Sequence, residues 1–223
     1  MLRNKLILVA TIIFGFVAIT MFIGIMIFMP PKASPHSIVV IDTLGLRNGD
    51  LLFRNGNGGE SRLVTTMSNS NYSHIAFAHR AATGWHAVHA VPGETPSIHD
   101  IDYLKSEPIE AFYHYERACA GAVARVDCAD SIALEALSFA LDKVARQFAF
   151  DHSYRLGDTT EYYCTELIYE AYRSVGINLA DERRHELPMP GTDGYFIFPS
   201  DILCSPHISS LRVFQTQPSS TAQ

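Results

Sequence analysis

Residues 163–175 read Tyr-Cys-Thr-Glu-Leu-Ile-Tyr-Glu-Ala-Tyr-Arg-Ser-Val, and the interpretation of the whole chain starts from this stretch. Apolar residues follow Cys164 at intervals of three, four, seven and eleven positions, namely Leu167, Ile168, Ala171 and Val175. This spacing is typical of one face of an α-helix. We therefore predict a helix from about Cys164 to Val175 that Gly176 closes as a left-handed cap, with Cys164 in the first turn on the buried face.

The position of Cys164 suits a nucleophile. A thiol in the first turn lies at the positive end of the helix dipole, near backbone N–H groups that have no partner within the helix. These groups would lower the pKa of the thiol and could hold the oxyanion of an acyl-transfer reaction. An inert buried cysteine is the alternative, because cysteine is among the most frequently buried residues.

The chain before Cys164 changes from a strand pattern to a helix pattern. Candidate strands, separated by turn residues, are 38–41, 51–53, 73–79, 85–91, 111–115 and 121–126. Asp130 or Ser131 can then cap a helix. Its apolar positions follow the 3.6-residue repeat and are Ile132, Leu134, Leu137, Leu141, Val144, Ala145 and Phe148. Strands followed by helices predict an α+β fold.

Two histidines on neighbouring candidate strands are possible partners of the thiol. If the two strands form a hairpin with an even-numbered loop centred on Ala81-Ala82, with Gly84 in the turn, His74 lies directly opposite His89. His89 could then hold His74 in one tautomer, as the third member of a catalytic triad does. An odd-numbered loop would put His89 on the other face, and the sequence leaves this choice open.

Four segments, taken in chain order, resemble a known family. They are Gly49-Asp50-Leu51-Leu52-Phe53, Tyr72-Ser73-His74-Ile75-Ala76, Ala87-Val88-His89-Ala90 and Tyr163-Cys164-Thr165-Glu166-Leu167-Ile168-Tyr169. With them the chain resembles the circularly permuted branch of the papain-like NlpC-type amidases, specifically the YiiX/YaeF-type cysteine hydrolases. In that family the histidine comes early, on a strand, and the cysteine comes late, at the start of a helix. The resemblance covers most of residues 46–177 and implies a permuted papain-like domain.

The resemblance also implies roles for individual residues. Carried over to this chain, Cys164 is the nucleophile and His74 is the base. The position that orients the base, often a glutamate in this family, falls on His89. Glu94, five residues further on, is the alternative orienting residue.

Two more residues of the matching segments are candidate contacts to the substrate or the oxyanion. Tyr72 could supply an extra oxyanion donor, although a core tyrosine would explain it equally well. Glu166 lies two positions after Cys164 and therefore points to a different helix face. This position favours a partner for the helix dipole over an acid catalyst.

The N-terminus contains a predicted membrane anchor, Leu6–Met29, whose 24 residues carry no charge. As a helix this segment would be about 36 Å long, which is enough to cross a hydrocarbon core of about 30 Å. Arg3 and Lys5 precede it and favour a cytoplasmic N-terminus, and Pro30-Pro31 end it. A cleaved signal peptide is the alternative, but its apolar stretch is usually shorter and ends in small residues.

These observations divide the chain into five parts. They are a cytoplasmic N-terminus (1–5), a transmembrane anchor (6–29), a linker (30–37), a hydrolase domain (38–214) and a flexible tail (215–223). We expect a single-pass protein of the inner (cell) membrane with its catalytic domain in the periplasm.

The composition argues against several other functions. A net charge of −6 without a basic stripe argues against a nucleic-acid partner. His86 and His89 would face opposite sides of a strand, and no metal-binding or phosphate-binding motif is present, so we expect neither a metal nor another cofactor. Four cysteines are too few for a disulfide scaffold. Cys119 and Cys128 could still pair in an oxidising compartment.

We therefore expect a membrane-anchored cysteine hydrolase. It would cleave an amide bond, such as that of a cell-wall stem peptide, through a Cys-His-His triad and a thioester acyl-enzyme. The same chemistry would also suit a lipid deacylase or acyltransferase, and the same fold could serve as a non-catalytic module that binds cell-wall peptide or lipid. A charged groove beside Cys164 would favour a peptide, and an apolar groove would favour a lipid.

Overall fold

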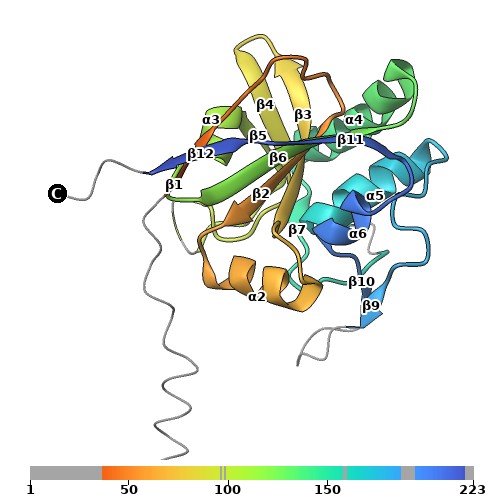
Figure 1. Ribbon diagram of the computed structural model, residues 1–223. Coiled ribbons are helices and arrows are strands. Elements are labelled where there is room, and N and C mark those ends of the chain that lie inside the picture. Colours follow the sequence, from red (N-terminus) through yellow and green to blue (C-terminus); the bar gives the residue numbers. More distant parts are fainter. Residues whose placement is uncertain (1–36, 96, 98, 158–159, 187–193, 219–223) are drawn as a thin grey trace, which may run out of the picture. The chain divides into compact units, whose positions relative to one another are not determined.

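The computed structural model of the protein describes residues 37–95, 97, 99–157, 160–186 and 194–218 (Figure 1). The predicted membrane anchor Leu6–Met29 lies outside these residues, together with the N-terminus before it and most of the linker. Within the described part, no helix is both long and apolar enough to cross a membrane. The anchor therefore stays a prediction from the sequence.

A six-stranded antiparallel sheet forms the centre of the described domain. In spatial order its strands are β11 (Ile208–Val213), β6 (Ala118–Val126), β2 (Leu51–Gly56), β3 (His74–Ala81), β4 (Gly84–His89) and β5 (Lys105–Pro108). The strands in the middle of the sheet are the most apolar, because both of their faces are covered. The fold is mixed α and β, as the change of periodicity along the chain predicted.

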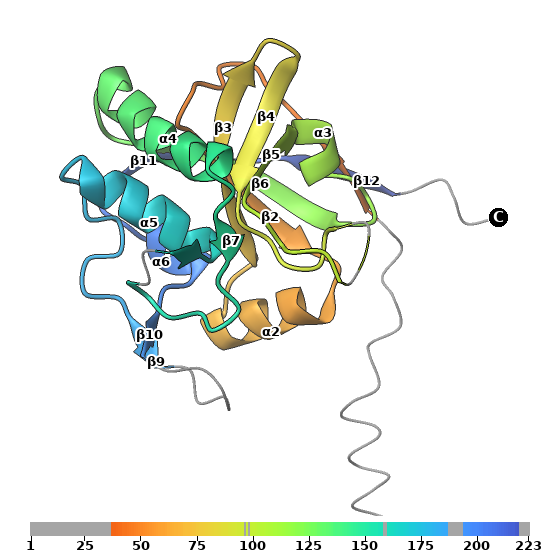
Figure 2. The same cartoon turned by 180° about the vertical axis from the view of Figure 1, so that it is seen from behind.

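The residues of β3 alternate between two apolar cores. Ile75 and Phe77 pack into the larger core, which includes residues of α4 (Asp130–Ala145) and α5 (Cys164–Ser174). Ala76 and Ala78 pack into the smaller core with residues of α3 (Ile109–Phe112). Figure 2 shows α4 and α5 side by side on one side of the sheet and α3 on the other. The period-two alternation predicted for this strand is confirmed.

The two long helices begin close to where the sequence predicted them. α5 ends at Ser174, and Gly176 follows with a φ of +84°, a conformation that costs glycine little. α4 starts at Asp130, but neither Asp130 nor Ser131 is its N-cap, contrary to the prediction from the sequence. The N-cap is Ala129, whose side chain makes no hydrogen bond. Leu134 is 47% exposed rather than packed. The buried face of α4 consists instead of Ala136, Leu137 and Ala140.

Three elements differ from the sequence prediction. α2 (Gly59–Ser68) follows a predicted loop and has no buried residue, so it lacks the apolar stripe that would reveal it. β5 carries no apolar alternation and is defined by its pairing with β4. The predicted strand 111–115 is wrong. Its first two residues belong to α3, where Ile109 and Phe112 bury one helical turn against the sheet.

The first four residues of the predicted tail form a strand. β12 (Gln215–Pro218) pairs antiparallel with β1 (Ser37–Val40). All four residues of β12 are exposed, so no hydrophobic pattern marks the strand, and its backbone pairing holds it in place. Residues 219–223 lie outside the described part.

Short elements surround the start of α5. They are β7 (Ala149–Phe150), which pairs in parallel with β8 (Glu161–Tyr162), the antiparallel pair β9 (His185–Glu186) and β10 (Tyr195–Phe196), and α6 (Pro199–Leu203). The β7–β8 pair brings the two ends of the loop before α5 together. This pairing fixes where the chain enters the helix and therefore where Cys164 lies.

Candidate active site

The β3–β4 hairpin brings His74 and His89 together. Its two-residue turn is Ala82-Thr83, and Gly84 is already the first residue of β4. The pairing is therefore shifted by two residues from the predicted register, because Phe77 lies opposite Val88. The loop is even-numbered, so both histidines keep the same face and meet diagonally instead of directly opposite. His74 Nε2 lies 2.8 Å from His89 Nδ1.

The ring of Phe112 packs against both imidazole rings. The Phe112 ring of α3 lies 5.7 Å from the His74 ring and 5.1 Å from the His89 ring, measured between centroids. His74 is 7% exposed and His89 is 0% exposed. The two rings are therefore held by packing as well as by their hydrogen bond.

The second nitrogen of His89 binds a residue that the sequence analysis did not identify. His89 Nε2 lies 3.0 Å from Glu107 Oε1. Glu107 lies on β5 opposite Ala87, so its side chain shares a sheet face with His89. Lys105 and Arg117 contact the other oxygen of Glu107 at 3.4 Å and 2.9 Å. Glu107 could not be found from the sequence because β5 itself was not predicted.

Both histidines are neutral near pH 7. Burial and the Arg54 guanidinium lower the pKa of His74 well below 6.5. Burial, only partly offset by the hydrogen bond to Glu107, lowers the pKa of His89 to about 4. Burial alone would raise the pKa of Glu107, but the hydrogen bond to His89 and the charges around it lower this pKa to about 2.

Cys164 lies at the start of α5, as predicted, and is partly buried. Its Sγ lies 3.6 Å from Thr165 Oγ1. The backbone N–H groups of Ile75 and Thr165 also point to the sulfur. Ile75 can do so because the described pairing of β3 with β4 ends at Phe77, so the first residues of β3 lie beyond the ladder.

The predicted lowering of the thiol pKa is wrong for this geometry. Burial raises the pKa of Cys164, and the hydrogen bonds from Thr165 and from the backbone of Ile75 offset this only in part. The resting site therefore holds a neutral thiol beside a neutral imidazole. All four cysteines lie in the described part and are free, so the Cys119–Cys128 disulfide is not formed.

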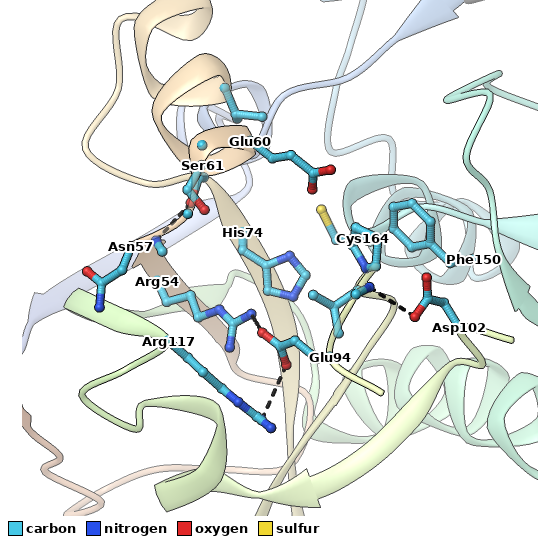
Figure 3. Close-up of a pocket in the computed structure, with 18 of the residues that line it drawn as sticks. Arg54, Asn57, Glu60, Ser61, His74, Glu94, Asp102, Arg117, Phe150 and Cys164 are labelled. Carbon is cyan, nitrogen blue, oxygen red and sulfur yellow. Dashed lines mark hydrogen bonds and ion pairs between the residues drawn. The ribbon is translucent and has the colours of Figure 1, made fainter. Parts of the chain in front are cut away.

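One pocket of about 570 Å³ contains both Cys164 and His74 on its wall. Figure 3 shows these two side chains and Glu60 turned into the same space. The charged residues on its wall are Arg54, Arg117, Glu60, Glu94, Asp102 and Glu116. An aromatic side of the wall comes from Phe150, Tyr154 and Phe196.

Glu94 does not contact either histidine in the described structure. Its carboxylate forms ion pairs with Arg54, Lys105 and Arg117. The Arg54 side chain is 4% exposed, donates to the Phe112 carbonyl at 2.9 Å and stacks over the Phe112 ring. No described hydrogen bond joins Glu94 to His74, and the residue that contacts His74 Nε2 is His89.

Tyr72 and Glu166 lie away from the pocket. The Tyr72 ring packs on Phe53, with centroids 5.6 Å apart, and Tyr72 is not among the described residues that line the pocket. Glu166 is fully buried, and its Oε1 accepts a hydrogen bond from the Gly157 N–H at 2.6 Å. Neither residue is placed to contact a substrate next to the sulfur.

Tyr154 lines the pocket where Tyr72 does not. Burial raises the pKa of Tyr154, and the charges of Glu60 and Cys164 raise it further, which places the phenol near both groups. Its φ of +53° is uncommon for a residue other than glycine. Tyr154 lies in the irregular segment before α5, and no periodicity of the sequence there indicates it.

Comparison with known proteins bears on the fold. No family model and no curated protein matches the chain. Among solved structures, it is similar to the crystal structure of the metalloprotein YiiX from Escherichia coli O157:H7, with a TM-score of 0.58 and 15% sequence identity. The alignment covers 78% of this chain and 98% of that chain. The chain has a YiiX-like fold. At this identity the likeness concerns the fold alone.

YiiX is described as a metalloprotein, so we tested whether the residues of the YiiX-like fold in this chain suit a metal ion. The described residues contain no group of three or more His, Cys, Asp or Glu that could hold one. His74 Nε2 and both nitrogens of His89 are already engaged with each other and with Glu107. These residues do not fit a metal site, and the reaction proposed below uses none.

Proposed function

We propose that this protein is a cysteine hydrolase of the permuted papain type that acts on an amide bond through a thioester acyl-enzyme. One observation carries the proposal. A cysteine at a helix start and a histidine that is held by a second, buried histidine come from opposite faces of the sheet, and Cys164 and His74 line the same pocket. A nucleophile and a base that is held by a third group are the parts that acyl transfer requires.

In the first step Sγ of Cys164 attacks the carbonyl carbon of the substrate, and its proton passes to His74. The electron pair of the C=O double bond moves to the oxygen. Backbone N–H groups at the start of α5 and the Tyr154 hydroxyl are the donors we assign to this oxyanion. Because the pKa of Tyr154 is raised, the phenol stays protonated and can donate.

Collapse of the tetrahedral intermediate breaks the bond to the leaving amine, and the His74 imidazolium gives this amine its proton. Water then attacks the thioester, with His74 acting as base, and Cys164 leaves as the thiol. The low pKa of His74 makes it a weak base for the thiol in the resting site, so proton transfer has to coincide with the attack of Sγ on the carbonyl carbon. The same low pKa makes the imidazolium a strong proton donor to the leaving amine.

The charges of the pocket favour a peptide over a lipid. Acidic and basic groups lie on the same wall, including Glu60 beside the nucleophile and Arg117 opposite it. A peptide with free amino and carboxylate groups can satisfy such a wall, whereas an acyl chain cannot. With the predicted anchor Leu6–Met29 placing the domain outside the cytoplasm, a cell-wall stem peptide is the substrate we propose.

A lipid substrate remains the second candidate because of the aromatic wall and the outer face of α2. Phe150 and Phe196 line the pocket, and α2, which contributes Val64 to its wall, also carries the exposed Leu63 (45%) and Met67 (39%). An apolar chain could lie along these side chains.

The test is to trap the acyl-enzyme. The full chain is incubated separately with stem-peptide amides and with phospholipid esters, and intact-mass spectrometry follows the mass added to the protein. We expect a peptide acyl adduct that Cys164→Ala abolishes, and a rate of formation that His74→Ala lowers by about 10²–10⁴-fold. Cys204→Ala, at an exposed cysteine outside the pocket, is the matched control and keeps the adduct.

Adducts from phospholipid alone would favour the lipid candidate. If neither class gives an adduct and iodoacetamide labels Cys164 no differently from Cys204 in wild type and His74→Ala, the hydrolase proposal fails. The non-catalytic binding module would then be the better description.

A further inference from the structure

A line of hydrogen bonds runs from the pocket to the far edge of the sheet. It starts at His74 on the pocket wall, passes through His89 at 2.8 Å and ends at Glu107 at 3.0 Å. Its members come from three adjacent strands, β3, β4 and β5. The sheet itself therefore sets the spacing of the three groups.

The protonation states along this line follow from its end. Glu107 is ionised and so can only accept a hydrogen bond, which requires the proton of neutral His89 to be on Nε2. Nδ1 of His89 is then an acceptor, and the 2.8 Å contact requires a proton on Nε2 of His74. Because His74 is also neutral, its Nδ1 carries the free lone pair.

We propose that Glu107 is a positioning residue that selects the tautomers of both histidines and thereby keeps Nδ1 of His74 ready to take the proton of Cys164. The role rests on the proposed function, since it matters only if Cys164 is the nucleophile. When His74 takes that proton, its imidazolium keeps it until the leaving group is protonated. His89 and Glu107 keep their own protonation states throughout.

The competing explanation is that Glu107 only neutralises the cations around it. The groups that face it are the neutral His89 and the cations Lys105 and Arg117, and Arg54 lies close to His89. Glu94 separates the two explanations, because it forms ion pairs with Lys105 and Arg117 but has no described contact with either histidine. A purely structural role would make Glu94 and Glu107 equivalent.

The first experiment reads the tautomers directly by two-bond ¹H–¹⁵N correlation NMR on the full chain with ¹⁵N-labelled histidine, near pH 7. We expect wild type to show both rings protonated on Nε2. Glu107→Ala should give a mixture of tautomers at His89 and His74, and Glu94→Gln should leave the wild-type pattern. Protonation of His74 on Nδ1 in wild type would overturn the proposal, and so would identical spectra for Glu94→Gln and Glu107→Ala.

The second experiment measures the rate at which iodoacetamide alkylates Cys164 at pH 7. We expect Glu107→Ala to lower this rate by about 10–100-fold, by analogy with the loss of the hydrogen-bond partner behind a metal-ligating histidine. Glu107→Gln keeps an acceptor oxygen without the charge and should restore the rate to within about fivefold of wild type. Glu94→Gln removes the carboxylate that pairs with the buried Arg54, so its alkylation rate is read together with its histidine tautomers, which should stay as in wild type.

A Glu107→Ala rate equal to that of wild type would overturn the positioning role. If Glu107→Ala does not fold, the wild-type tautomers and the two glutamine variants still decide. If the histidines show the expected tautomers but no substrate gives an acyl adduct, the hydrolase proposal alone is refuted. If an acyl adduct forms but the histidines show the opposite tautomers, only the role of Glu107 is refuted.

Discussion

Two glutamates, one behind the histidines and one beneath the loop that leads to Cys164, have pKa values that shift in opposite directions. The pKa of Glu107 is about 2, and that of Glu166 is about 8. Burial raises both, so burial does not explain the difference. Glu107 has a histidine and two cations as neighbours, whereas Glu166 has the Gly157 N–H as donor and Asp151 as a charged neighbour.

The difference shows that largely buried carboxyl groups on the two sides of the candidate site have different protonation states. The side of the base is organised to keep one negative charge at a fixed place. On the side of the nucleophile, Glu166 and the Cys164 thiol both retain their protons near pH 7. The largely buried negative charge behind His74 comes from Glu107, at the β5 edge of the sheet.

The largest expected effect is a loss of stability on acidification, which tests the side of the site that contains His74 and His89. The pKa of His89 is about 4 when folded and near 6.5 when unfolded, so the unfolded chain binds its proton first as the pH falls. Stability is full above pH 6.5 and should drop by roughly 3 kcal/mol between pH 6.5 and 4 on account of this group. Urea unfolding of the full chain across this range measures it.

His89→Asn is the matched control because it cannot titrate. Its free energy of unfolding should change less between pH 6.5 and 4 than that of wild type. Glu107 acts in a lower window, between about pH 4.5 and 2, so it does not obscure the comparison. Parallel curves for the two proteins would show that His89 is not held neutral.

The next largest effect is the stability gained at pH 8 when Glu166 is replaced, which tests the side of the site that contains Cys164. Because the folded pKa of Glu166 is raised to about 8, the native state binds this proton more tightly, and stability is lost as the pH rises from about 4.5 to 8. Glu166→Gln removes that loss, which amounts to roughly 4 kcal/mol at pH 8. The net gain at pH 8 should be roughly 2 kcal/mol, because the Gln amide N–H₂ meets no described acceptor at the position of Oε2, and there should be no gain at pH 4. Thermal unfolding at both pH values measures the gain.

Glu170→Gln, one turn further along α5, is the control. Glu170 pairs with Arg173 at 2.6 Å, so its loss should stabilise the protein at neither pH. An equal gain in both variants would mean that the buried proton of Glu166 does not cause the effect.

The smallest effect concerns the cations at the edge of the sheet. Lys105 contacts Glu94 at 3.0 Å and Glu107 at 3.4 Å, and its side chain is 25% exposed. Lys105→Met should raise the pKa of Glu107 and cost less than about 1 kcal/mol, since solvent screens such a pair. The carboxyl ¹³C shift of Glu107 against pH reports the change. Lys143→Met, on α4, should leave that titration unmoved.

Much of the fold could be predicted from local patterns. The period of two in β3 and the 3.6-residue repeat after Cys164 each reflect burial of one face, and the structure confirms both. Elements without a buried stripe were missed, as α2 and β12 show. Such elements are held by backbone pairing or by their neighbours, and neither leaves a period in the sequence.

The candidate site divides in the same way. His74, His89 and Cys164 were identified from residue type, spacing and resemblance, and the structure places His74 and Cys164 on one pocket with His89 behind His74. Glu107 was missed because it belongs to a strand recognised only by its partner. Tyr154 was missed because it lies in a loop, where the path of the chain decides which side chain reaches the pocket.

The sequence by itself determined which strand residues share a face and where the helix of Cys164 begins and ends, because each depends on residues a few positions apart. Only the tertiary structure decided the register of the hairpin, the partner of His89 and the direction of the thiol pKa shift. Register depends on a turn whose length the sequence left open. A pKa depends on burial and on charges brought close from distant parts of the chain, and both exist only after folding.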